Sequence, residues 1–296
     1  MTEKYFSPQR TTADGRAMLN VGCGGRFHPD WTNVDLKAVS PLVIEYNILK
    51  NLPFEDNVFD VVYHSHILEH LSRSAGEKLL RECVRVLKPG GIIRVVVPDL
   101  AYSCQLYLEC LKAVKNSDAK KQALAAENYQ WALLNLIDQM VRTQSGGETA
   151  PFIRQKILLD IEFMINTAGG TEVKMLRQGI ENTKSQSTLS RIKRLTPAKT
   201  LRLVSNRINN AAQRLIVGTQ HKEIFFRQMG EVHQWMYDSY SLGELLKQTG
   251  FSQVNFLTSE TSAIIKWDTF YLDIDRDGAV HKPNSLLAEA VKATKS

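Results

Sequence analysis

A glycine turn followed closely by a carboxylate constrains this chain more than any other feature. Residues 19–25, Leu-Asn-Val-Gly-Cys-Gly-Gly, are typical of a strand that runs into a tight turn, and residues 32–36 are typical of a second strand, with Asp35 near its end. Glycines at such a turn let backbone amides approach a ligand at the carboxyl edge of a parallel sheet. A carboxylate at Asp35 can accept hydrogen bonds from both hydroxyls of a ribose. The pattern therefore predicts a nucleoside cofactor.

The spacing argues against a dinucleotide. Phe27 stands where a dinucleotide fold has its third glycine, and Asp35 follows Gly24 by eleven residues rather than about 20. The helix whose amino terminus would hold a pyrophosphate has little room to form. An enzyme that uses NAD or a nucleotide sugar is therefore ranked third, after the two hypotheses given at the end of this section.

Two further segments point to a family. Residues 52–71 read Leu-Pro-Phe-Glu-Asp-Asn-Val-Phe-Asp-Val-Val-Tyr-His-Ser-His-Ile-Leu-Glu-His-Leu, and residues 87–91 read Leu-Lys-Pro-Gly-Gly. With the glycine turn, these segments resemble the class I S-adenosylmethionine-dependent methyltransferases over residues 17–100. The resemblance implies an α/β fold, a Rossmann-like doubly wound sheet of about seven mostly parallel strands with an antiparallel last strand. It also implies an enzyme, a transferase whose cofactor is S-adenosyl-L-methionine.

Hydrophobic periodicity predicts the elements of this sheet. Apolar residues at helical spacing predict a helix over 75–86, which stops before Pro89-Gly90-Gly91, and a second helix over 239–249, with Gly250 at its end. Strands are predicted at 17–21, 32–36, 42–44, 60–63, 92–97, 251–257 and 267–272.

The middle of the chain has a different pattern, with helical periodicity and no convincing strand between residue 101 and about residue 230. Helices are predicted over 122–141 and 151–167. We expect three parts: residues 1–100 as the cofactor-binding half of the core, 101–230 as a helical, partly basic insertion, and 231–296 as the returning helix with the last strands and the tail. An insertion at this place is expected to cover the substrate site and to select the substrate.

The resemblance also assigns cofactor-binding residues. Asn47 stands where relatives carry an acid that binds the adenine amino group, and an asparagine carbonyl can accept the same hydrogen bond. Asn20 replaces another acid of the family, which weakens a predicted contact with the cofactor amino group. The full set of predicted cofactor contacts is Gly22, Cys23, Gly24, Asp35, Leu36, Asn47, Ile48 and Ser65.

Methyl transfer from a sulfonium depends mainly on positioning, which can supply about 7 to 11 kcal/mol. A general base is needed only when the acceptor is a hydroxyl or a protonated amine. His66, Asp99 and His233 are the candidate catalytic residues, and His70 is a further candidate base. Asp99 could orient an acceptor hydroxyl. Structural alternatives are a capping turn for Ser65 and His66, the opening of a helix for Glu69 and His70, and anchoring of the insertion for the segment 233–238.

Composition is that of a soluble globular protein, with 43% hydrophobic and 23% charged residues. The first residues contain no apolar run, and no stretch has the length of a membrane span. The four cysteines have no C-x-x-C pairing and no zinc spacing, so no metal site is predicted and the small side chain of Cys23 is expected to serve packing. We expect a reduced, cytoplasmic location.

Positive charge is concentrated in residues 173–222, which hold eleven Lys or Arg and one acid, Glu181. The net charge of this segment is +10, whereas that of the whole chain is +6, so the remaining residues together carry −4. Apolar residues recur at three or four residues between Leu201 and Leu215, which predicts an amphipathic basic helix. The charge has three interpretations: a solvated helical face, peripheral contact with an anionic membrane or a lipid-linked phosphate, and nucleic acid.

The favoured hypothesis is a methyltransferase that acts on a hydroxyl or carboxyl-bearing acceptor, with a saccharide or a lipid-linked glycan as the proposed acceptor class. The alternative is a nucleic-acid-binding or RNA-modifying protein that uses the basic insertion. A steep dependence of RNA or heparin binding on salt, without methyl transfer, would separate the second from the first.

Overall fold

The computed structural model describes residues 10–154, 160–168, 226 and 230–294. The chain divides into two compact units, one formed by Met1–Gln105 with His233–Ser296 and the other by Leu106–Val232. Each unit has its own core and is described by itself.

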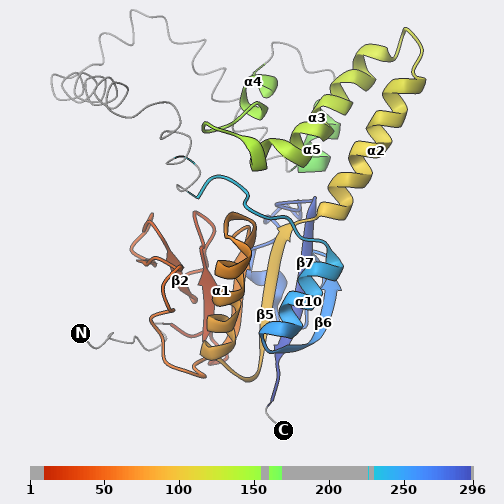
Figure 1. Cartoon of the computed structure of the whole chain (residues 1–296). Coiled ribbons are helices and arrows are strands. Elements are labelled where there is room, and N and C mark those ends of the chain that lie inside the picture. The colour runs from red at the N-terminus through yellow and green to blue at the C-terminus, as the bar shows by residue number, and fades with distance from the viewer. Residues whose placement is uncertain (1–9, 155–159, 169–225, 227–229, 295–296) are drawn as a thin grey trace, which may run out of the picture. The chain divides into compact units, whose positions relative to one another are not determined.

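The first unit is built on a seven-stranded sheet with the order β3-β2-β1-β4-β5-β7-β6 (Figure 1). Strands β1 to β5 are parallel to one another, and β7 is antiparallel to both β5 and β6. The predicted Rossmann-like sheet, with its antiparallel last strand, is confirmed. The strands are β1 (Met18–Val21), β2 (Thr32–Asp35), β3 (Val43–Glu45), β4 (Phe59–Ser65), β5 (Leu87–Pro98), β6 (Phe251–Leu257) and β7 (Ser285–Lys292).

Strand order places the site at the carboxyl ends of β1 and β4, because the chain leaves β1 for β2 on one side and reaches β4 on the other. In open α/β sheets, ligands bind at such a switch point, beyond the carboxyl ends of the strands. The chain between β1 and β2 forms turns and no helix. This agrees with the sequence argument against a pyrophosphate-binding helix.

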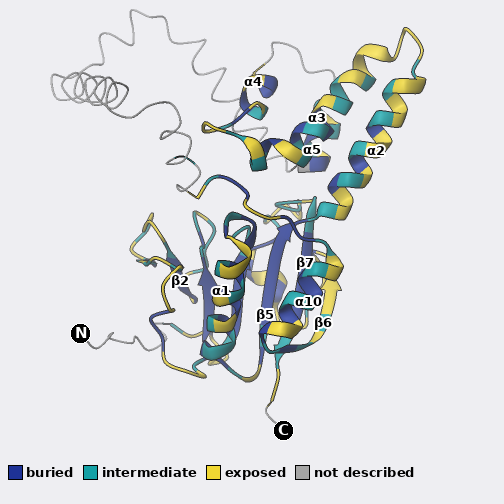
Figure 2. Ribbon diagram, viewed as in Figure 1, coloured by how far each residue is buried: buried dark blue, intermediate teal, exposed yellow. Residues whose placement is uncertain are grey.

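The two faces of the sheet are covered differently. Helices α1 (Arg73–Val86) and α10 (Ser239–Thr249) cover one face, and Figure 2 shows the central strand β5 as buried. The other face is covered by an aromatic cluster around Trp31, Tyr63 and Trp267, the last of which lies in the short helix η2 (Trp267–Phe270). Successive residues of a strand point to opposite faces, so Val62 belongs to the first core and Tyr63 to the second. A further short helix, η1 (Leu68–His70), follows β4.

The second unit is helical over its described residues, with α3 (Gln122–Val141), α4 (Thr149–Ile153), α5 (Ile161–Ala168) and most of α2 (Leu100–Asn116). One of its apolar clusters contains Trp131, Phe152 and Met164, and another joins α2 to α3 through Leu106, Cys110 and Ala132. Buried Asp138 accepts hydrogen bonds from the Glu148 amide and the Thr149 hydroxyl, which ties the end of α3 to the start of α4.

Two predicted elements were wrong. Residues 267–272 do not form the last strand, because the chain there turns through η2, and the last strand is β7. The single helix predicted over 151–167 is also wrong, because α4 ends at Ile153 and α5 begins at Ile161. The helices at 122–141 and 239–249 and the strand at 251–257 agree with the structure at both ends.

The predictions for the basic segment 173–222 and its amphipathic helix lie outside the described residues. Among the helices that the structure describes, none is long and apolar enough to cross a membrane.

Candidate functional site

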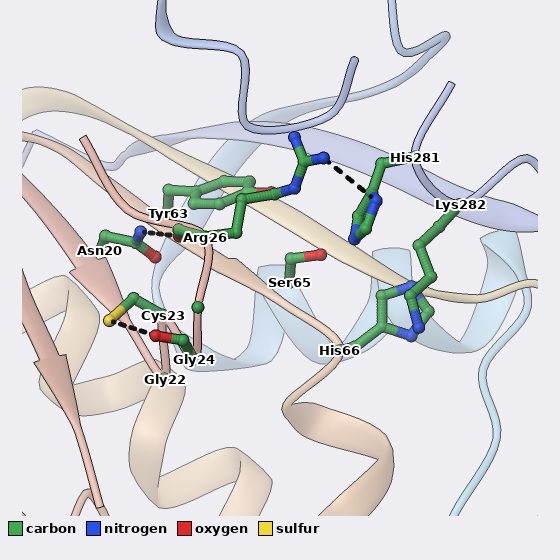
Figure 3. A pocket seen from close by; sticks show the side chains of 11 residues that line it. Asn20, Gly22, Cys23, Gly24, Arg26, Tyr63, Ser65, His66, His281 and Lys282 are labelled. Atoms are coloured by element: carbon green, nitrogen blue, oxygen red, sulfur yellow. Dashed lines mark hydrogen bonds between the residues drawn. The ribbon is translucent and has the colours of Figure 1, made fainter. Parts of the chain in front are cut away.

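A cavity of about 210 Å³ lies where β1 and β4 end (Figure 3). Its lining residues come from the glycine turn, from the end of β4 and from a segment that precedes β7. The lining residues are Asn20, Gly22, Cys23, Gly24, Gly25, Arg26, Tyr63, Ser65, His66, His281 and Lys282. The structure therefore brings five of the predicted site residues together here, namely Gly22, Cys23, Gly24, Ser65 and His66.

The glycine turn has the geometry that its sequence requires. Gly22 has φ +66°, and a Cβ there would lie 2.2 Å from Cδ1 of Ile67, so no other residue fits without a rearrangement. The amides of Gly22 and Cys23 donate to the Val34 carbonyl at 2.8 and 3.2 Å, which fixes the turn against β2. Burial, with a smaller contribution from the nearby Asp35 carboxylate, raises the pKa of the Cys23 thiol to about 12. Such a thiol is neutral at pH 7, as expected of a packing residue.

Asp35 ends β2 beside this turn. Its Oδ2 accepts the Gly24 amide at 2.8 Å, and its Oδ1 accepts the Lys37 amide at 3.2 Å. The carboxylate is thus oriented by two backbone donors and keeps further lone pairs for a ligand hydroxyl. Asp35 is not among the residues that line the cavity.

Leu36, Asn47 and Ile48 also lie outside the cavity. Leu36 is 64% exposed. Asn47 is exposed and its Oδ1 accepts the Leu49 amide at 3.0 Å, while Ile48 packs against the first core. The turn and the end of β4 therefore line the cavity. The residues predicted to hold the adenosine lie outside it, at the ends of the neighbouring strands β2 and β3.

His66 is held between two polar partners. Its Nδ1 lies 2.8 Å from Oε1 of Glu69, and its Nε2 lies 3.0 Å from Oγ of Ser285. Glu69 is fully buried, and burial alone would raise its pKa, but His66 and then His70 and His233 outweigh burial and hold the pKa at about 2. A charged carboxylate at Nδ1 orients an imidazole so that Nε2 can accept a proton, which is the arrangement of a general base with its positioning residue.

Asp99 and His233 do not line the cavity. The Asp99 carboxylate accepts the amides of Ala101 and Tyr102 at 2.9 and 3.2 Å, so it caps the first turn of α2. His233 is buried, and its ring packs edge-on against His70 with 4.8 Å between centroids. These two predicted catalytic residues are thus not among the residues that line the cavity.

Sequence reasoning did not predict contacts from Arg26, Tyr63, His281 and Lys282. Arg26 Nη2 lies 3.2 Å from Nδ1 of His281, which is 255 residues away in the chain. Burial and then the charges of Arg26 and Lys282 lower the pKa of His281 to about 4, so His281 is neutral at pH 7. Arg26 follows the turn directly and Tyr63 lies on β4, whereas the return of the chain before β7 brings His281 and Lys282 to the cavity.

The comparisons with known proteins match the core of the first unit. Residues 19–95 match a protein family described as a methyltransferase domain. A probable S-adenosylmethionine-dependent methyltransferase of Mycolicibacterium smegmatis is 32% identical over 102 residues, which cover 29% of this chain and 39% of that protein. This chain thus spans about two fifths of the length of that curated relative.

Solved structures are more distant. The YcgJ protein of Bacillus subtilis shares 10% identity over 97% of this chain and 95% of its own, with a TM-score of 0.38. A 1,6-didemethyltoxoflavin-N1-methyltransferase of Burkholderia thailandensis shares 21% identity over 30% of this chain and 46% of its own, with a TM-score of 0.25.

The glycine turn and most of the parallel strands β1 to β5 lie in the part of the chain that matches this family. Residues 19–95 are similar to the methyltransferase domain, and the matched segment resembles an S-adenosylmethionine-dependent methyltransferase.

Proposed function

We propose that the protein transfers the methyl group of S-adenosylmethionine to a hydroxyl group of a small-molecule acceptor, with His66 as the general base. The observation that carries the choice of a hydroxyl is the His66–Glu69 pair, with 2.8 Å between Nδ1 and Oε1, at the edge of the cavity. A carboxylate acceptor is already deprotonated and needs no base, whereas a hydroxyl has to lose its proton during transfer. The pair therefore favours a hydroxyl over a carboxyl group.

The cofactor part of the proposal uses the turn and its neighbours. Gly22, Cys23 and Gly24 would contact the methionine end, and Asp35 would accept the ribose hydroxyls, with Leu36, Asn47 and Ile48 around the adenine. Bound S-adenosylmethionine would supply an electrophilic methyl on a sulfonium, whose leaving group is a neutral thioether. The protein would then hold the acceptor oxygen in line, and Glu69 would stabilise His66 as it becomes positively charged.

A saccharide or a lipid-linked glycan remains the proposed acceptor class. Saccharides carry the hydroxyl groups that this chemistry needs. The insertion 101–230 would serve as the substrate cap, and its basic segment 173–222 would suit a lipid-linked phosphate at an anionic membrane.

Calorimetric titration with S-adenosylmethionine, S-adenosylhomocysteine and NAD tests the cofactor assignment. The two adenosyl ligands should bind and NAD should not. Asp35→Ala should lower the affinity for both adenosyl ligands by about 10-fold or more, because the two ribose hydroxyls lose their charged hydrogen-bond acceptor. Unchanged affinity in that variant would refute the ribose assignment.

Transfer of labelled methyl to a panel of saccharides and lipid-linked saccharides tests the base. His66→Gln should lower kcat by about 10²- to 10⁴-fold and leave the affinity for S-adenosylhomocysteine nearly unchanged. His28→Gln is the matched control, because His28 packs against Phe270 outside the cavity. A His66→Gln enzyme with wild-type kcat on a hydroxyl acceptor would exclude His66 as the base.

A further inference from the structure

A second cluster of polar side chains lies next to the cavity but outside it. Glu69 and His70 belong to η1, and His233 stands where the chain re-enters the first unit. One ligand atom from each of these three residues lies within 4.8 Å of the other two. Two imidazole nitrogens and one carboxylate oxygen are a donor set that binds zinc and related divalent transition metals.

Backbone hydrogen bonds hold the two segments together before any ligand is considered. The amides of Gln234 and Trp235 donate to the Glu69 carbonyl at 2.6 and 3.2 Å. The Gln234 side chain donates to the His70 carbonyl at 2.9 Å. The cluster is therefore preorganised by main-chain contacts and does not depend on mobile surface side chains.

Two neighbouring polar groups show that this region is unusual. His64 is fully buried on β4, and within the described part of the chain neither of its ring nitrogens has a hydrogen-bond partner. The Tyr237 hydroxyl is also buried without a partner among those residues. His64 lies on β4, two residues before His66, and Tyr237 follows His233 by four residues. Buried polar groups without a partner are rare in folded proteins, and a bound ion or an ordered water molecule commonly satisfies them.

We propose that Glu69, His70 and His233 form a binding site for a divalent transition metal of the zinc type. Zinc binds nitrogen and oxygen ligands at about 2.0 to 2.2 Å, so its ligand atoms stand about 3.3 Å apart in a tetrahedron. The most separated pair in the cluster has to close by at most about 1.5 Å, which small side-chain rotations supply. Magnesium and calcium prefer oxygen ligands and do not suit a site with two imidazoles.

The metal would act on the structure next to the cavity rather than on the methyl donor. Oε1 of Glu69 lies beside His66, and Oε2 is buried with no hydrogen-bond partner among the described residues, so Oε2 would be the metal ligand. Metal binding would thus fix the carboxylate that orients His66 and would fasten the re-entering segment to η1. Hydrogen bonds around ligands commonly set ligand orientation in this way. The site departs from the sequence prediction of no metal, which considered cysteine spacing and not residues brought together by folding.

Zinc binding to the full chain tests the proposal without the need for an acceptor. After treatment with a chelator and gel filtration, one equivalent of Zn²⁺ should bind with a Kd of ~1 μM or below, and it should raise the Tm. Mg²⁺ should do neither. In His70→Gln and His233→Gln, the zinc affinity should fall by about 100-fold or more, since even groups that only orient ligands contribute about 10- to 100-fold. His28→Gln should bind zinc as the wild type does.

X-ray absorption of the zinc-loaded wild type keeps the test valid if a variant does not fold. The expected spectrum shows nitrogen and oxygen ligands with the outer-shell scattering of two imidazoles. A sulfur ligand would place zinc at the cysteines and overturn the proposal. So would the absence of zinc binding, equal binding of Mg²⁺, or wild-type affinity in both histidine variants.

Discussion

At the scale of single residues, Arg94 shows how a buried charge is satisfied on the aromatic face of the sheet. Its side chain has no exposed surface, and it contacts Asp273 at 2.7 Å and Glu289 at 2.6 Å. The guanidinium also lies over the ring of Trp267, 4.7 Å from the centroid. Asp273 in turn accepts the Tyr63 hydroxyl at 2.7 Å. This network joins β4, β5 and β7 to η2 beneath the cavity.

Replacing Arg94 should therefore destabilise the first unit strongly. Arg94→Leu leaves two buried carboxylates without their cation, and we expect a loss of about 3 to 5 kcal/mol in the free energy of unfolding. Arg81→Leu is the control, because Arg81 pairs with Glu77 on the surface, where such a pair contributes about 1 kcal/mol or less. Urea denaturation of both variants measures the difference. Similar losses in the two variants would contradict the role given to the buried network.

His64 should make stability depend on pH. Burial, opposed in part by the charge of Glu69, lowers the pKa of His64 from 6.5 to about 4. The unfolded chain then binds a proton between pH 6.5 and 4 that the folded chain does not, so stability falls as pH falls through this window. The shift corresponds to about 3 kcal/mol. His64→Phe should lose this part of the pH dependence.

Denaturant unfolding at pH 6.5 and 4.5 for the wild type and His64→Phe checks this expectation. Carboxylates and His281 titrate in both proteins, so their contributions cancel in the difference between the two slopes. Equal changes of stability with pH in the two proteins would mean that His64 takes up its proton over the same pH range in the folded and the unfolded chain.

Among single residues, the sequence predicts best the site residues that lie at the ends of strands. Gly22 and His66 were predicted as site residues, and they meet at one cavity because parallel strands β1 and β4 end at the same edge of the sheet. His281 was not predicted, because no pattern near it indicates that it lies beside Arg26. Whether the cavity binds the cofactor, and whether His66 acts as a base, stay predictions.

At the scale of elements, the end of the chain shows where local preference misleads. Residues 285–292 contain Leu, Ala and Glu, which favour helices, yet they form β7. Pairing with strands on both sides and the placement of Glu289 opposite Arg94 outweigh that preference. Residues 267–272 are rich in aromatic residues, which favour strands. The structure has left-handed φ values of 60° and 53° at Lys266 and Tyr271, which turn the chain at both ends of η2.

Helix α10 was predicted with correct ends, with Gly250 as its stop signal, and the structure adds a capping box at its start. Asp238 accepts the Ser241 amide at 2.8 Å, and Ser241 accepts the Asp238 amide at 3.0 Å, while Gly250 ends the helix with φ 114°. Asp238→Ala should cost about 1 to 2 kcal/mol of stability. The corresponding cap of α1 has a longer bond, 3.3 Å from the Ala75 amide to Ser72 Oγ.

Ser72→Ala is therefore the comparison for Asp238→Ala, and it should cost less. Thermal unfolding of the two variants, with circular dichroism as the readout, measures both. A larger loss for Ser72→Ala would contradict the ranking by bond geometry.

At the scale of the whole molecule, the two units have separate cores. Every residue of the two large clusters around the sheet comes from the first unit, and the clusters of the helical part come from the second. A unit with its own core can in principle fold by itself. Its seven strands, the glycine turn and the cluster at η1 are all encoded outside residues 106–232.

The first unit should therefore fold without the insertion. We expect a variant in which a Gly/Ser linker of about 10 or about 20 residues replaces 106–232 to be soluble and to unfold cooperatively, since such linkers span about 17 to 27 Å on average. It should bind S-adenosylhomocysteine within about 10-fold of the full chain, because the predicted cofactor contacts all lie in the first unit. It should lose transfer to the acceptor if the insertion is the substrate cap. Calorimetry and the methyl-transfer assay separate these results, and a variant that keeps full transfer would show that the insertion does not bind the acceptor.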